Sequence, residues 1–506
     1  MKKKTAGKVY LTGAGPGDPG LLTLRARALL ESADVVIHDW LVSEGVLRYA
    51  AQALKIDMGK HPLKRGRKRG ALQDAINREL VRQARAGKKV VRLKGGDPLV
   101  FGRGSEEALY LKKNGIPFEF VPGVSAGYAV PEYAGIPVTD RKFASQVTFV
   151  TGHEDPIKTE SSVDWKKLAA LKGTIVSFMG VRSLERITRL LAVCGRDEKT
   201  PVSVIEWGTL PHQRVVEGTL ATIAREAERK KIGSPALVVI GDVNRMRREL
   251  MWFEKKPLAG KKVLVTRARE QASRLRVLLE EQGAAVAEFP AIRILPPAGW
   301  KTFDQEIPRL GSYDWIVFTS VNGVQSVFER LSFKKRDARV FAGAKIAVIG
   351  EATGRALEEH GLKPDMMPPA YHSKSLFEKF KKQETLRGKK ILLLRTDIAP
   401  ELLSQSLKKE QAQVREITVY RTRPDLAAAK KLREWLKSNT PDFVTFTSGS
   451  TVRYFFEALG KEKLKAGIRL LSIGPMTTEV LRSYGVRPYR EARTHTLEGL
   501  VESLLA

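Results

Sequence analysis

The stretch from residue 90 to residue 107, VVRLKGGDPLVFGRGSEE, constrains the fold more than any other part of the chain. A short β-prone run at 90–93 breaks at GGDP, residues 95–98, and Ser-Glu-Glu at 105–107 is typical of a helix start. Two glycines let a ligand approach the backbone closely, and the Asp97 carboxylate suits hydroxyls or a cationic group. Because ligands of α/β proteins lie at the C-terminal ends of strands, this loop is a candidate binding site, although an ordinary glycine-rich turn has the same composition.

Composition indicates a globular protein of a reducing, cytoplasmic compartment. With 506 residues, 42% of them hydrophobic, the chain is too long for a single core and should form about three or four compact units. No uncharged apolar run of about 18 residues occurs, so no membrane span is expected. The N-terminal lysines lack the apolar segment of a secretory signal. The single cysteine, Cys194, excludes an internal disulfide, and without an HExxH-type pair among the seven histidines we expect no metal.

The net charge is strongly positive, because 88 Lys and Arg residues against 56 Asp and Glu give a formal charge of +32. Three classes fit this charge: a nucleic-acid-binding protein, an enzyme for polyanionic substrates, and a protein with a merely basic surface. The densest cluster, at 61–69, is accompanied by no RNA-binding signature or helix-turn-helix. Aromatic residues do not interleave with basic ones to form a stacking platform. These observations favour a basic surface that attracts an anionic substrate, with nucleic-acid binding as the alternative.

A second glycine-rich loop lies near the N-terminus. Residues 8–11 predict a strand that ends at GAGPGDPG, residues 13–20, where Asp18 and Pro19 are a typical N-cap and first residue of a helix. The spacing G-x-G-x-x-G within this loop satisfies the dinucleotide fingerprint, so an NAD-dependent dehydrogenase is an alternative. However, Pro16 and Pro19 remove two amide donors from a loop that would have to bind a pyrophosphate.

Strand, loop and helix alternate along the whole chain, which predicts an α/β protein. The best linker, KKPLAGKK at 255–262, is polar, charged and punctuated by proline and glycine. A fresh strand at 263–266 follows it directly, as at the start of a second protein. Further strands of the first half are expected at 34–37, 118–121, 146–151, 174–180, 202–205 and 236–241.

One pattern recurs after the linker: an apolar strand, a loop rich in hydroxyl groups or glycine, and a helix. The runs WIVFTS at 315–320 and FVTFTS at 443–448 are alike, as are IAVIG at 346–350 and LLSIG at 470–474. This similarity indicates an internal duplication, in which two α/β lobes would place the loops around one cleft. No acid–base dyad or nucleophilic triad is evident in this half.

Several long motifs follow one another between residue 8 and about residue 250: VYLTGAGPGDPGLLTLRARALLESADVVIHDWLVS, VVRLKGGDPLVFGRGSEE, VPGVSAGYAVPEYAGIPVTDR, TGH, Met179-Gly180 and GTLPHQRVVEGTL. With these motifs the first half resembles uroporphyrinogen-III C-methyltransferase, of the tetrapyrrole methylase superfamily. The resemblance implies two α/β subdomains, at about 8–142 and 143–250, and a homodimer. It also implies transfer of two methyl groups from S-adenosylmethionine to uroporphyrinogen III, giving precorrin-2. The macrocycle carbon would be the nucleophile, so the protein would mainly position the sulfonium methyl and remove a proton.

The same resemblance implies roles for individual residues. Asp39 would accept a proton and Lys60 would donate one, although a helix-capping aspartate and a solvated lysine would look the same in sequence. The chain departs from the family at 61–67, where a Gly-x-His pattern is usual, and at Asp140, where histidine is common. Contacts with S-adenosyl-L-methionine, and with the product S-adenosyl-L-homocysteine, are implied for Pro16, Gly95, Gly96, Asp97, Val100, Ser125, Ala126, Met179, Gly208 and Ala236.

The second half, from residue 261 to about residue 504, has hydroxyl-ended strands, paired TS loops and the run ITVY at 417–420. In these features it resembles uroporphyrinogen-III synthase, which implies closure of linear hydroxymethylbilane with inversion of the last ring and release of water. A cleft of hydroxyls and backbone amides would suit that reaction. Tyr420 matches the tyrosine proposed to help the hydroxyl leave, and an interface tyrosine is the alternative. Side chains that would bind substrate carboxylates, or else only cap loops, are Thr319, Ser320, Asn322, Ser373, Thr447, Ser448 and Ser450.

These inferences predict a bifunctional cytoplasmic enzyme with a methyltransferase at 1–252, a linker at 253–260 and a synthase at 261–506. The synthase should divide into one lobe at 261–294 plus 425–506 and a second lobe at 295–424. Its partners would be small polyanionic tetrapyrroles, with no nucleic acid and no membrane. The positive surface would then raise the rate of encounter with substrates that carry eight carboxylates.

Overall fold

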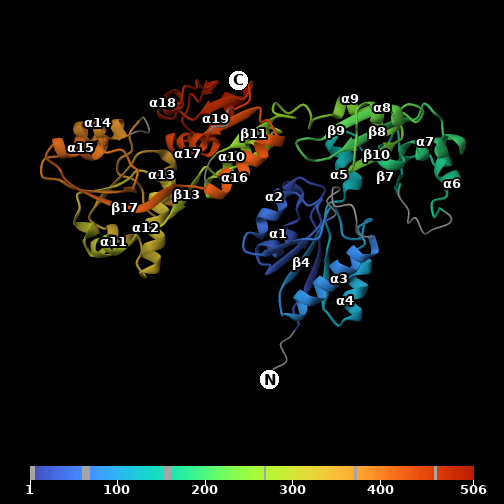
Figure 1. The fold of residues 1–506 in the computed structure, drawn as a ribbon, viewed down its shortest axis with the longest axis horizontal. Helices are drawn as coiled ribbons and strands as arrows, with labels where there is room; N and C mark the ends of the chain where they lie inside the picture. Colours follow the sequence, from blue (N-terminus) through green and yellow to red (C-terminus); the bar gives the residue numbers. More distant parts are fainter. Residues whose placement is uncertain (1–5, 60–68, 153–160, 267–268, 370–372, 461–463) are drawn as a thin grey trace. The chain divides into compact units, whose positions relative to one another are not determined.

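The computed structural model describes residues 6–59, 69–152, 161–266, 269–369, 373–460 and 464–506. The chain forms two compact units (Figure 1): one holds Met1–Lys261 with Gln282–Ala285, and the other holds Lys262–Glu281 with Val286–Ala506. Each unit is built on two five-stranded sheets with helices against them, so the chain is α/β. Within the described ranges, no helix is long and apolar enough to cross a membrane.

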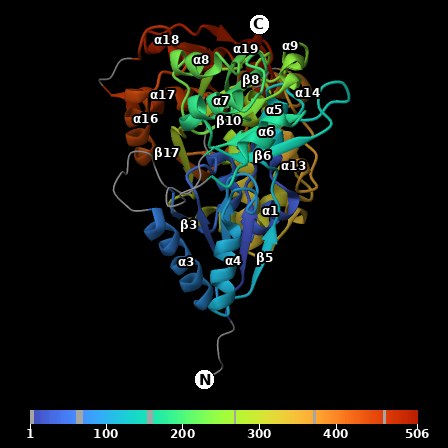
Figure 2. The same cartoon turned by 90° about the vertical axis from the view of Figure 1, so that its right-hand side faces the viewer.

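The first sheet of the N-terminal unit is parallel throughout, in the order β3-β2-β4-β1-β5. Helices α3 and α4 lie together against one of its faces (Figure 2), and α1 covers the other. Because both faces are covered, β2 and β4 are buried along their whole length. The elements are β1 (Val9–Gly13), α1 (Leu24–Glu31), β2 (Val35–His38), α2 (Glu44–Leu47), β3 (Leu54–Asp57), α3 (Arg69–Arg85), β4 (Val90–Lys94), α4 (Gly104–Lys113) and β5 (Phe118–Val121).

The chain leaves β1 toward β2 and leaves β4 toward β5, in opposite directions across the sheet. The carboxyl ends of β1 and β4 therefore form a topological switch point, where open α/β sheets bind their ligands. Gly15 and Gly96 meet there in a backbone bridge. A side chain on Gly123 would lie 2.3 Å from the carbonyl oxygen of Gly96, so only glycine fits this junction.

The second sheet of this unit is mixed, in the order β6-β7-β10-β8-β9, with only β6 and β7 parallel. Helix α5 follows the first sheet in sequence but packs on the second, because Val130 and Ala134 join the core of Val176 and Val239. This helix thus links the two subdomains. The elements are α5 (Ala126–Tyr133), β6 (Val147–Thr151), α6 (Trp165–Ala170), β7 (Thr174–Phe178), α7 (Leu184–Val193), β8 (Pro201–Glu206), β9 (Arg214–Thr219), α8 (Ile223–Arg229), β10 (Ala236–Ile240) and α9 (Arg247–Leu250).

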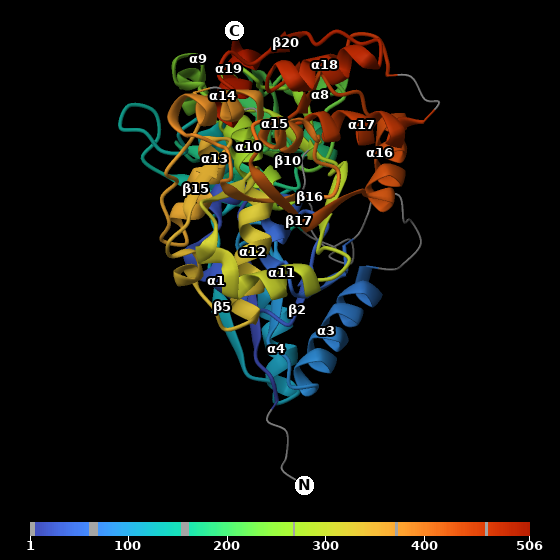
Figure 3. The same ribbon diagram turned by 90° about the vertical axis from the view of Figure 1, so that its left-hand side faces the viewer.

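The C-terminal unit contains the sheets β12-β11-β18-β19-β20 and β13-β17-β16-β14-β15. In the second of these sheets the long strand β17 runs beside β16 (Figure 3), and β14, β15 and β16 are parallel. The strands are β11 (Lys262–Val265), β12 (Ala285–Glu288), β13 (Ile292–Leu295), β14 (Trp315–Phe318), β15 (Lys345–Val348), β16 (Lys390–Thr396), β17 (Gln413–Pro424), β18 (Phe443–Phe446), β19 (Arg469–Ser472) and β20 (Arg490–Glu491). The helices are α10 (Arg269–Glu281), α11 (Lys301–Glu306), α12 (Val321–Phe333), α13 (Glu351–Glu358), α14 (Ser373–Gln383), α15 (Leu402–Lys409), α16 (Leu426–Ser438), α17 (Gly449–Leu459), α18 (Pro475–Ser483) and α19 (Leu497–Leu505).

Strand β13 lies close to the boundary expected between the two lobes, at about residue 294. It pairs antiparallel with β17, with Ile292 opposite Pro424 and Leu295 opposite Arg421, so it belongs to the sheet of β14–β17. The sequence does not reveal the pairing because the partner strand lies more than a hundred residues further along the chain.

Four charged side chains form a mostly buried cluster behind the carboxyl end of β4. Arg92 donates to Asp39 at 2.6 Å and to Glu107 at 3.0 Å, and Lys94 donates to Glu107 at 3.0 Å. Burial opposes the charge on Arg92, but the two carboxylates outweigh burial and raise its pKa. Burial and the neighbouring Arg92 lower the pKa of Lys94. The Glu107 carboxylate therefore forms ion pairs with two buried side chains, Arg92 and Lys94.

Replacement of Glu107 by glutamine should destabilise the N-terminal unit strongly. Removing one partner from a buried ion pair costs about 3 kcal/mol or more, because a charge is left buried without compensation. The free energy of unfolding in urea, followed by tryptophan fluorescence, would measure this loss. Glu106→Gln is the matched control, since Glu106 pairs with Arg103 at the surface and should lose less than about 1 kcal/mol. Equal losses in the two variants would contradict a structural role for the buried cluster.

Candidate functional site

A cavity of about 410 Å³ lies where the two sheets of the N-terminal unit approach each other. Its walls come from the loops after β1, β4 and β7, the start of α5, and the residues around β10. All ten residues for which the family resemblance implies cofactor contacts line this one cavity: Pro16, Gly95, Gly96, Asp97, Val100, Ser125, Ala126, Met179, Gly208 and Ala236.

Asp97 organises the loop that forms one wall of the cavity. Its Oδ1 accepts the backbone N–H groups of Leu99, at 2.8 Å, and Val100, at 3.2 Å. Its Oδ2 accepts the N–H of Gly123, at 3.0 Å, and so ties the loop after β4 to the loop after β5. From the sequence, the Asp97 carboxylate was expected to bind ligand hydroxyls or a cationic group. In the structure, backbone N–H groups occupy most of its hydrogen-bond acceptor positions.

Several cavity residues were missed by sequence reasoning, and four of them are aromatic. Trp40 and Trp207 form an edge-to-face pair with ring centroids 5.9 Å apart. Phe101, Met179 and Trp207 have φ of 53°, 57° and 51°, the left-handed region that non-glycine residues rarely adopt. Such backbone strain clusters at functional sites. Two of these residues carried a sequence signal, because Trp40 follows Asp39 at a strand end and Phe101 lies within the stretch 90–107. The missed lining residues include Trp40, Leu41, Phe101, Phe178, Arg182 and Trp207.

The structure does not support the dinucleotide-binding alternative for the loop at 13–20. Gly15 exchanges backbone hydrogen bonds with Gly96, and the N–H of Asp18 bonds the Thr209 hydroxyl, so these donors are not available to a pyrophosphate. Asp18 and Pro19 are an N-cap and first helical residue, as predicted, but of a short 3₁₀ helix, whereas α1 begins only at Leu24 and is capped by Thr23. The two prolines and four glycines of the loop favour this short turn over a continuous α-helix.

Two residues of the N-terminal unit, Asp39 and Lys60, were expected to accept and to donate a proton. Asp39 lies at the end of β2, and its neighbours Trp40 and Leu41 line the cavity, while its own carboxylate contacts Arg92. Lys60 lies outside the described residues.

In the C-terminal unit, the paired TS loops have matching geometry. Thr319 and Ser320 follow β14, and the Ser320 hydroxyl caps α12 by accepting the N–H of Gly323. Thr447 and Ser448 follow β18, and Ser448 caps α17 in a capping box with Thr451. Ser450 lies 3.0 Å from Ser448, between their hydroxyl oxygens. Ser373 is the first residue of α14. The internal duplication therefore extends to the caps of the helices.

Tyr420 is 5% exposed, and its hydroxyl lies 2.9 Å from that of Ser320. Burial raises the pKa of Tyr420, although hydrogen bonds with Ser320, Thr396 and Asn322 oppose the shift. The phenol is therefore protonated at neutral pH and can act as a hydrogen-bond donor. Ser320 and Asn322, both expected near the substrate, are gathered around it.

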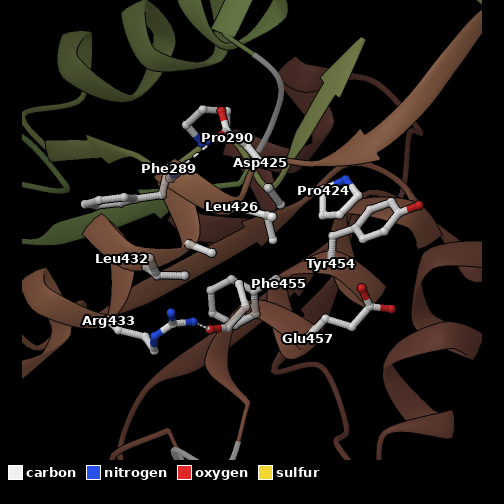
Figure 4. Close-up of a pocket in the computed structure, with 14 residues that line it drawn as sticks. Phe289, Pro290, Pro424, Asp425, Leu426, Leu432, Arg433, Tyr454, Phe455 and Glu457 are labelled. Atoms are coloured by element: carbon white, nitrogen blue, oxygen red, sulfur yellow. Dashed lines mark hydrogen bonds between the residues drawn. The ribbon is translucent and has the colours of Figure 1, made fainter. Parts of the chain in front are cut away.

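A second cavity, of about 200 Å³, lies elsewhere in the C-terminal unit (Figure 4). The chain segments at 289–291 and 424–426 form part of its wall, with Leu432 and Phe455 from α16 and α17. Arg433 reaches a backbone carbonyl at its edge. None of the residues expected to bind substrate lines this cavity, and its lining is largely apolar.

Comparisons with known proteins match the two units separately and the chain as a whole. A model described as Tetrapyrrole (Corrin/Porphyrin) Methylases matches residues 8–224, and one described as Uroporphyrinogen-III synthase HemD matches residues 273–502. The fold thus defines a methylase-type unit followed by a two-lobed synthase-type unit. The chain is 36% identical to a Ruminiclostridium josui protein described as Porphyrin biosynthesis protein HemD, over 99% of this chain and 98% of that protein. It belongs to the family of porphyrin biosynthesis proteins in which a tetrapyrrole methylase precedes a uroporphyrinogen-III synthase.

Other relatives match the first unit. The S-adenosyl-L-methionine-dependent uroporphyrinogen III methyltransferase of Methanosarcina barkeri is 53% identical over 47% of this chain and 92% of its own length. A solved uroporphyrin-III C-methyl transferase from Thermus thermophilus, complexed with S-adenyl homocysteine, is 40% identical over 47% of this chain and 94% of its own, with a TM-score of 0.40. A uroporphyrinogen III synthase structure from the same organism is 23% identical over 48% and 97%, with a TM-score of 0.39.

The raised pKa of Tyr420 predicts how stability changes in alkali. The folded state holds the phenol proton more tightly than the unfolded state, so the contribution to stability is complete below about pH 10. It is lost as pH rises through the higher folded-state pKa. In Tyr420→Phe, the unfolding free energy of the C-terminal unit should therefore fall less steeply above about pH 10 than in the unmodified chain. Denaturant unfolding at stepped pH measures this slope.

The exposed Tyr489 of the same unit provides the control. Tyr489→Phe should leave the pH slope as it is in the unmodified chain. If Tyr420→Phe also leaves the slope unchanged, Tyr420 does not bind its proton more tightly in the fold.

Proposed function

We propose that this chain is a bifunctional enzyme of tetrapyrrole biosynthesis. Its C-terminal unit closes hydroxymethylbilane to uroporphyrinogen III, and its N-terminal unit methylates that product twice with S-adenosylmethionine to give precorrin-2. The observation that carries the proposal is the single cavity lined by all ten expected cofactor residues. Membership of a family that joins a methylase to a synthase supports the same pairing of reactions.

The lining of the cavity fits S-adenosylmethionine. Gly95 and Gly96 expose bare backbone at the cavity wall. A Cβ on Gly95 would approach Leu41, and a Cβ on Gly96 would approach the backbone of Ala126, but both would otherwise point into open space. Apolar walls at Met179 and Ala236 suit a nucleoside and a thioether chain, while loop amides suit its polar ends. The bound donor supplies an electrophilic methyl group. The residues of the chain hold that group against the macrocycle carbon, which is a matter of position and orientation.

Proton transfer after methylation needs an acceptor near the cavity. Asp39 ends β2 next to two lining residues, and Arg92 fixes the position of its carboxylate. We assign Asp39 as the proton acceptor and Lys60 as the donor. The positive net charge of +32 would favour the approach of a substrate with eight carboxylates.

Ring closure needs a donor for the departing hydroxyl. Tyr420 supplies it, because burial keeps its phenol protonated. The Tyr420 proton passes to the leaving oxygen, water departs, and the methylene that remains is attacked by a pyrrole carbon. Hydroxyls at Thr319, Ser320, Thr447, Ser448 and Ser450, with Asn322 and Ser373, hold the substrate carboxylates. The remaining proposals are a cytoplasmic location, consistent with the single cysteine, and no nucleic-acid partner.

The direct experiment supplies hydroxymethylbilane and S-adenosylmethionine to the purified chain and follows the dimethylated product. Tyr420→Phe should slow ring closure and leave methylation of supplied uroporphyrinogen III unchanged. Formation of neither product by the unmodified chain would overturn the proposal. Tight, steeply salt-dependent binding of DNA would instead favour the nucleic-acid alternative.

Asp97→Ala should abolish methyl transfer and spare ring closure. The three backbone N–H groups that Asp97 accepts would lose their partner, so the cavity wall would no longer be held in place. Calorimetry with S-adenosylhomocysteine measures the loss of binding. Asp164→Ala is the matched control, because Asp164 also accepts a backbone N–H but caps α6, which contributes no residue to the cavity. Loss of both activities in Asp97→Ala would mean a general folding defect.

We further propose that the chain forms a homodimer through its N-terminal unit. Apolar side chains are exposed beside the cavity, among them Leu99, Phe101, Tyr128, Phe149 and Met179. Phe101 and Phe149 both pack on Phe178, so these residues belong to one connected surface. Exposed apolar patches of this kind mark association surfaces.

Phe149→Asp should convert the dimer to a monomer, because a charge would be buried in the interface without a partner. Sedimentation equilibrium measures the mass of the particle in solution. The control is Leu24→Asp, which changes a leucine that is 86% exposed on α1 and should leave the mass unchanged. A monomeric unmodified chain would refute this assignment.

A further inference from the structure

The C-terminal unit has a topological switch point of its own beside Tyr420. In the sheet β13-β17-β16-β14-β15, the chain leaves β14 toward β15 and leaves β16 toward β17, in opposite directions. Ligands of open α/β sheets bind outside the strand ends at such a point. Ser320 follows β14, and Thr396 is the last residue of β16. Thr396 therefore lies where a ligand is expected to bind, although it is not among the residues assigned to substrate binding or catalysis.

A β-bulge brings Tyr420 to this position. In the pairing of β16 with β17, Arg395 lies opposite Thr418, but the next residue, Thr396, lies opposite Tyr420. Val419 is the extra residue, and both it and Tyr420 are buried, which breaks the alternation of the strand. The register shift pairs Tyr420 with Thr396, and the Tyr420 hydroxyl lies 2.9 Å from that of Ser320, while Thr396 and Asn322 also influence the pKa of the phenol through hydrogen bonding.

Thr396 is itself held by a carboxylate. Asp397 accepts the Thr396 hydroxyl at 3.1 Å, the backbone N–H of Thr422 at 3.2 Å and the Arg423 guanidinium at 2.5 Å. Burial opposes the negative charge on Asp397, but these donors outweigh burial and keep its pKa below the usual value. Asp397 is therefore ionised at neutral pH and can only accept hydrogen bonds.

The ionised carboxylate sets the direction of the Thr396 hydrogen bond. The single hydroxyl proton of Thr396 is donated to Asp397, so the Thr396 oxygen is left to accept, from Tyr420 and from the Thr422 hydroxyl, whose oxygen lies 3.3 Å away. The Ser320 oxygen accepts the N–H of Gly323, and its own proton is available to the phenol oxygen. Donors can thus run from Ser320 to Tyr420, from Tyr420 to Thr396, and from Thr396 to Asp397, with Asn322 as a further hydrogen-bond partner of the phenol. With no carboxylate at the end, the reverse order would be equally available.

We propose that Thr396, oriented by Asp397, is a positioning residue that fixes the direction of the Tyr420 proton during ring closure. This inference rests on the proposed synthase activity. In the step itself, the Tyr420 phenol, which donates to Thr396 before reaction, gives its proton to the substrate hydroxyl, the C–O bond breaks and water leaves. Ser320 then donates to the phenolate oxygen. The last ring attacks the methylene through its substituted carbon, the bond from that carbon to the methylene of the preceding ring breaks and re-forms at the free α-carbon, and the proton lost from that α-carbon restores the phenol, so atoms and charge balance.

The test compares two substitutions at one position. Thr396→Val keeps the shape of the side chain but removes the hydroxyl, and Thr396→Ser keeps the hydroxyl. Loss of one hydrogen bond in the transition state should lower kcat for formation of uroporphyrinogen III by about tenfold in the valine variant, with KM unchanged within about twofold. The serine variant should stay within about threefold of the unmodified rate. Equal rates for the valine and unmodified chains would overturn the proposal.

Asp397 is tested through a double-mutant cycle. Asp397→Asn should slow ring closure in the unmodified background but not further in Thr396→Val, because Asp397 acts through Thr396. Independent, multiplying losses would contradict that coupling. Arg423→Gln removes the ion pair with Asp397 but keeps the Thr396 bond, so it should leave the rate within about threefold. A loss in Arg423→Gln as large as that in Asp397→Asn would mean that Asp397 acts only through the ion pair.

Failure of the inference and failure of the proposed function give different results. If the unmodified chain forms only the symmetric isomer that closes without inversion of the last ring, the synthase assignment itself is wrong. If it forms uroporphyrinogen III, and Tyr420→Phe slows this reaction while Thr396→Val does not, the inference alone is wrong. Methylation of supplied uroporphyrinogen III reports on the N-terminal unit alone, so the fold of the C-terminal unit in each variant is checked by its cooperative unfolding in denaturant.

Discussion

Three backbone segments meet without side chains at the carboxyl edge of the first sheet, and the N-terminal site depends on this contact. A Cβ on Gly13 would lie 2.5 Å from the Cα of Gly123 and 2.5 Å from the carbonyl oxygen of Gly96. Asp97 then ties the loop after β4 to the N–H of Gly123. These glycines are therefore needed for the close packing of the three backbone segments as well as for the access of a ligand to the backbone. Because the loops are locked to one another, they form a preformed wall rather than three separate flexible segments.

The sequence predicted the parts of this arrangement that are local. Strand ends, glycine pairs and family motifs identified ten of the residues that line the cavity, most of which lie in loops that follow a strand. Contacts between distant elements were not visible. Trp40 and Trp207 meet from different subdomains, and β13 joins a strand far along the chain. Asp18 caps a helix as predicted, but the sequence did not reveal that this helix is a short 3₁₀ turn, because a 3₁₀ turn and an α-helix start with the same residues. Arg92 is buried because helices cover both faces of the sheet, and no single stretch of the sequence reveals this.

In the C-terminal unit, a duplicated sequence supports an asymmetric site. Ser320 and Ser448 cap α12 and α17 in the same way, so each lobe presents a helix N-terminus and a hydroxyl, both suited to carboxylates. The Ser320 hydroxyl lies beside the phenol of Tyr420, whereas the Ser448 hydroxyl lies beside that of Ser450. The position of Tyr420 coincides with a register shift at one extra residue, Val419. A local change in register thus accompanies a buried phenol beside one of two otherwise similar helix-capping loops.

The two units need opposite proton chemistry, and their surroundings differ accordingly. Methylation of a carbon leaves a proton to be removed, and the proposed acceptor, Asp39, pairs with the guanidinium of Arg92. Loss of a hydroxyl needs a proton to be delivered, and the proposed donor, Tyr420, is a buried neutral acid; among the described residues, the nearby charge that affects its pKa is the carboxylate of Asp397. An acid kept protonated by burial and a nearby anion can donate at neutral pH without a dedicated acid–base dyad. The absence of such a dyad from the sequence of the second half is therefore consistent with a reaction that one phenol and a set of oriented hydroxyls can assist.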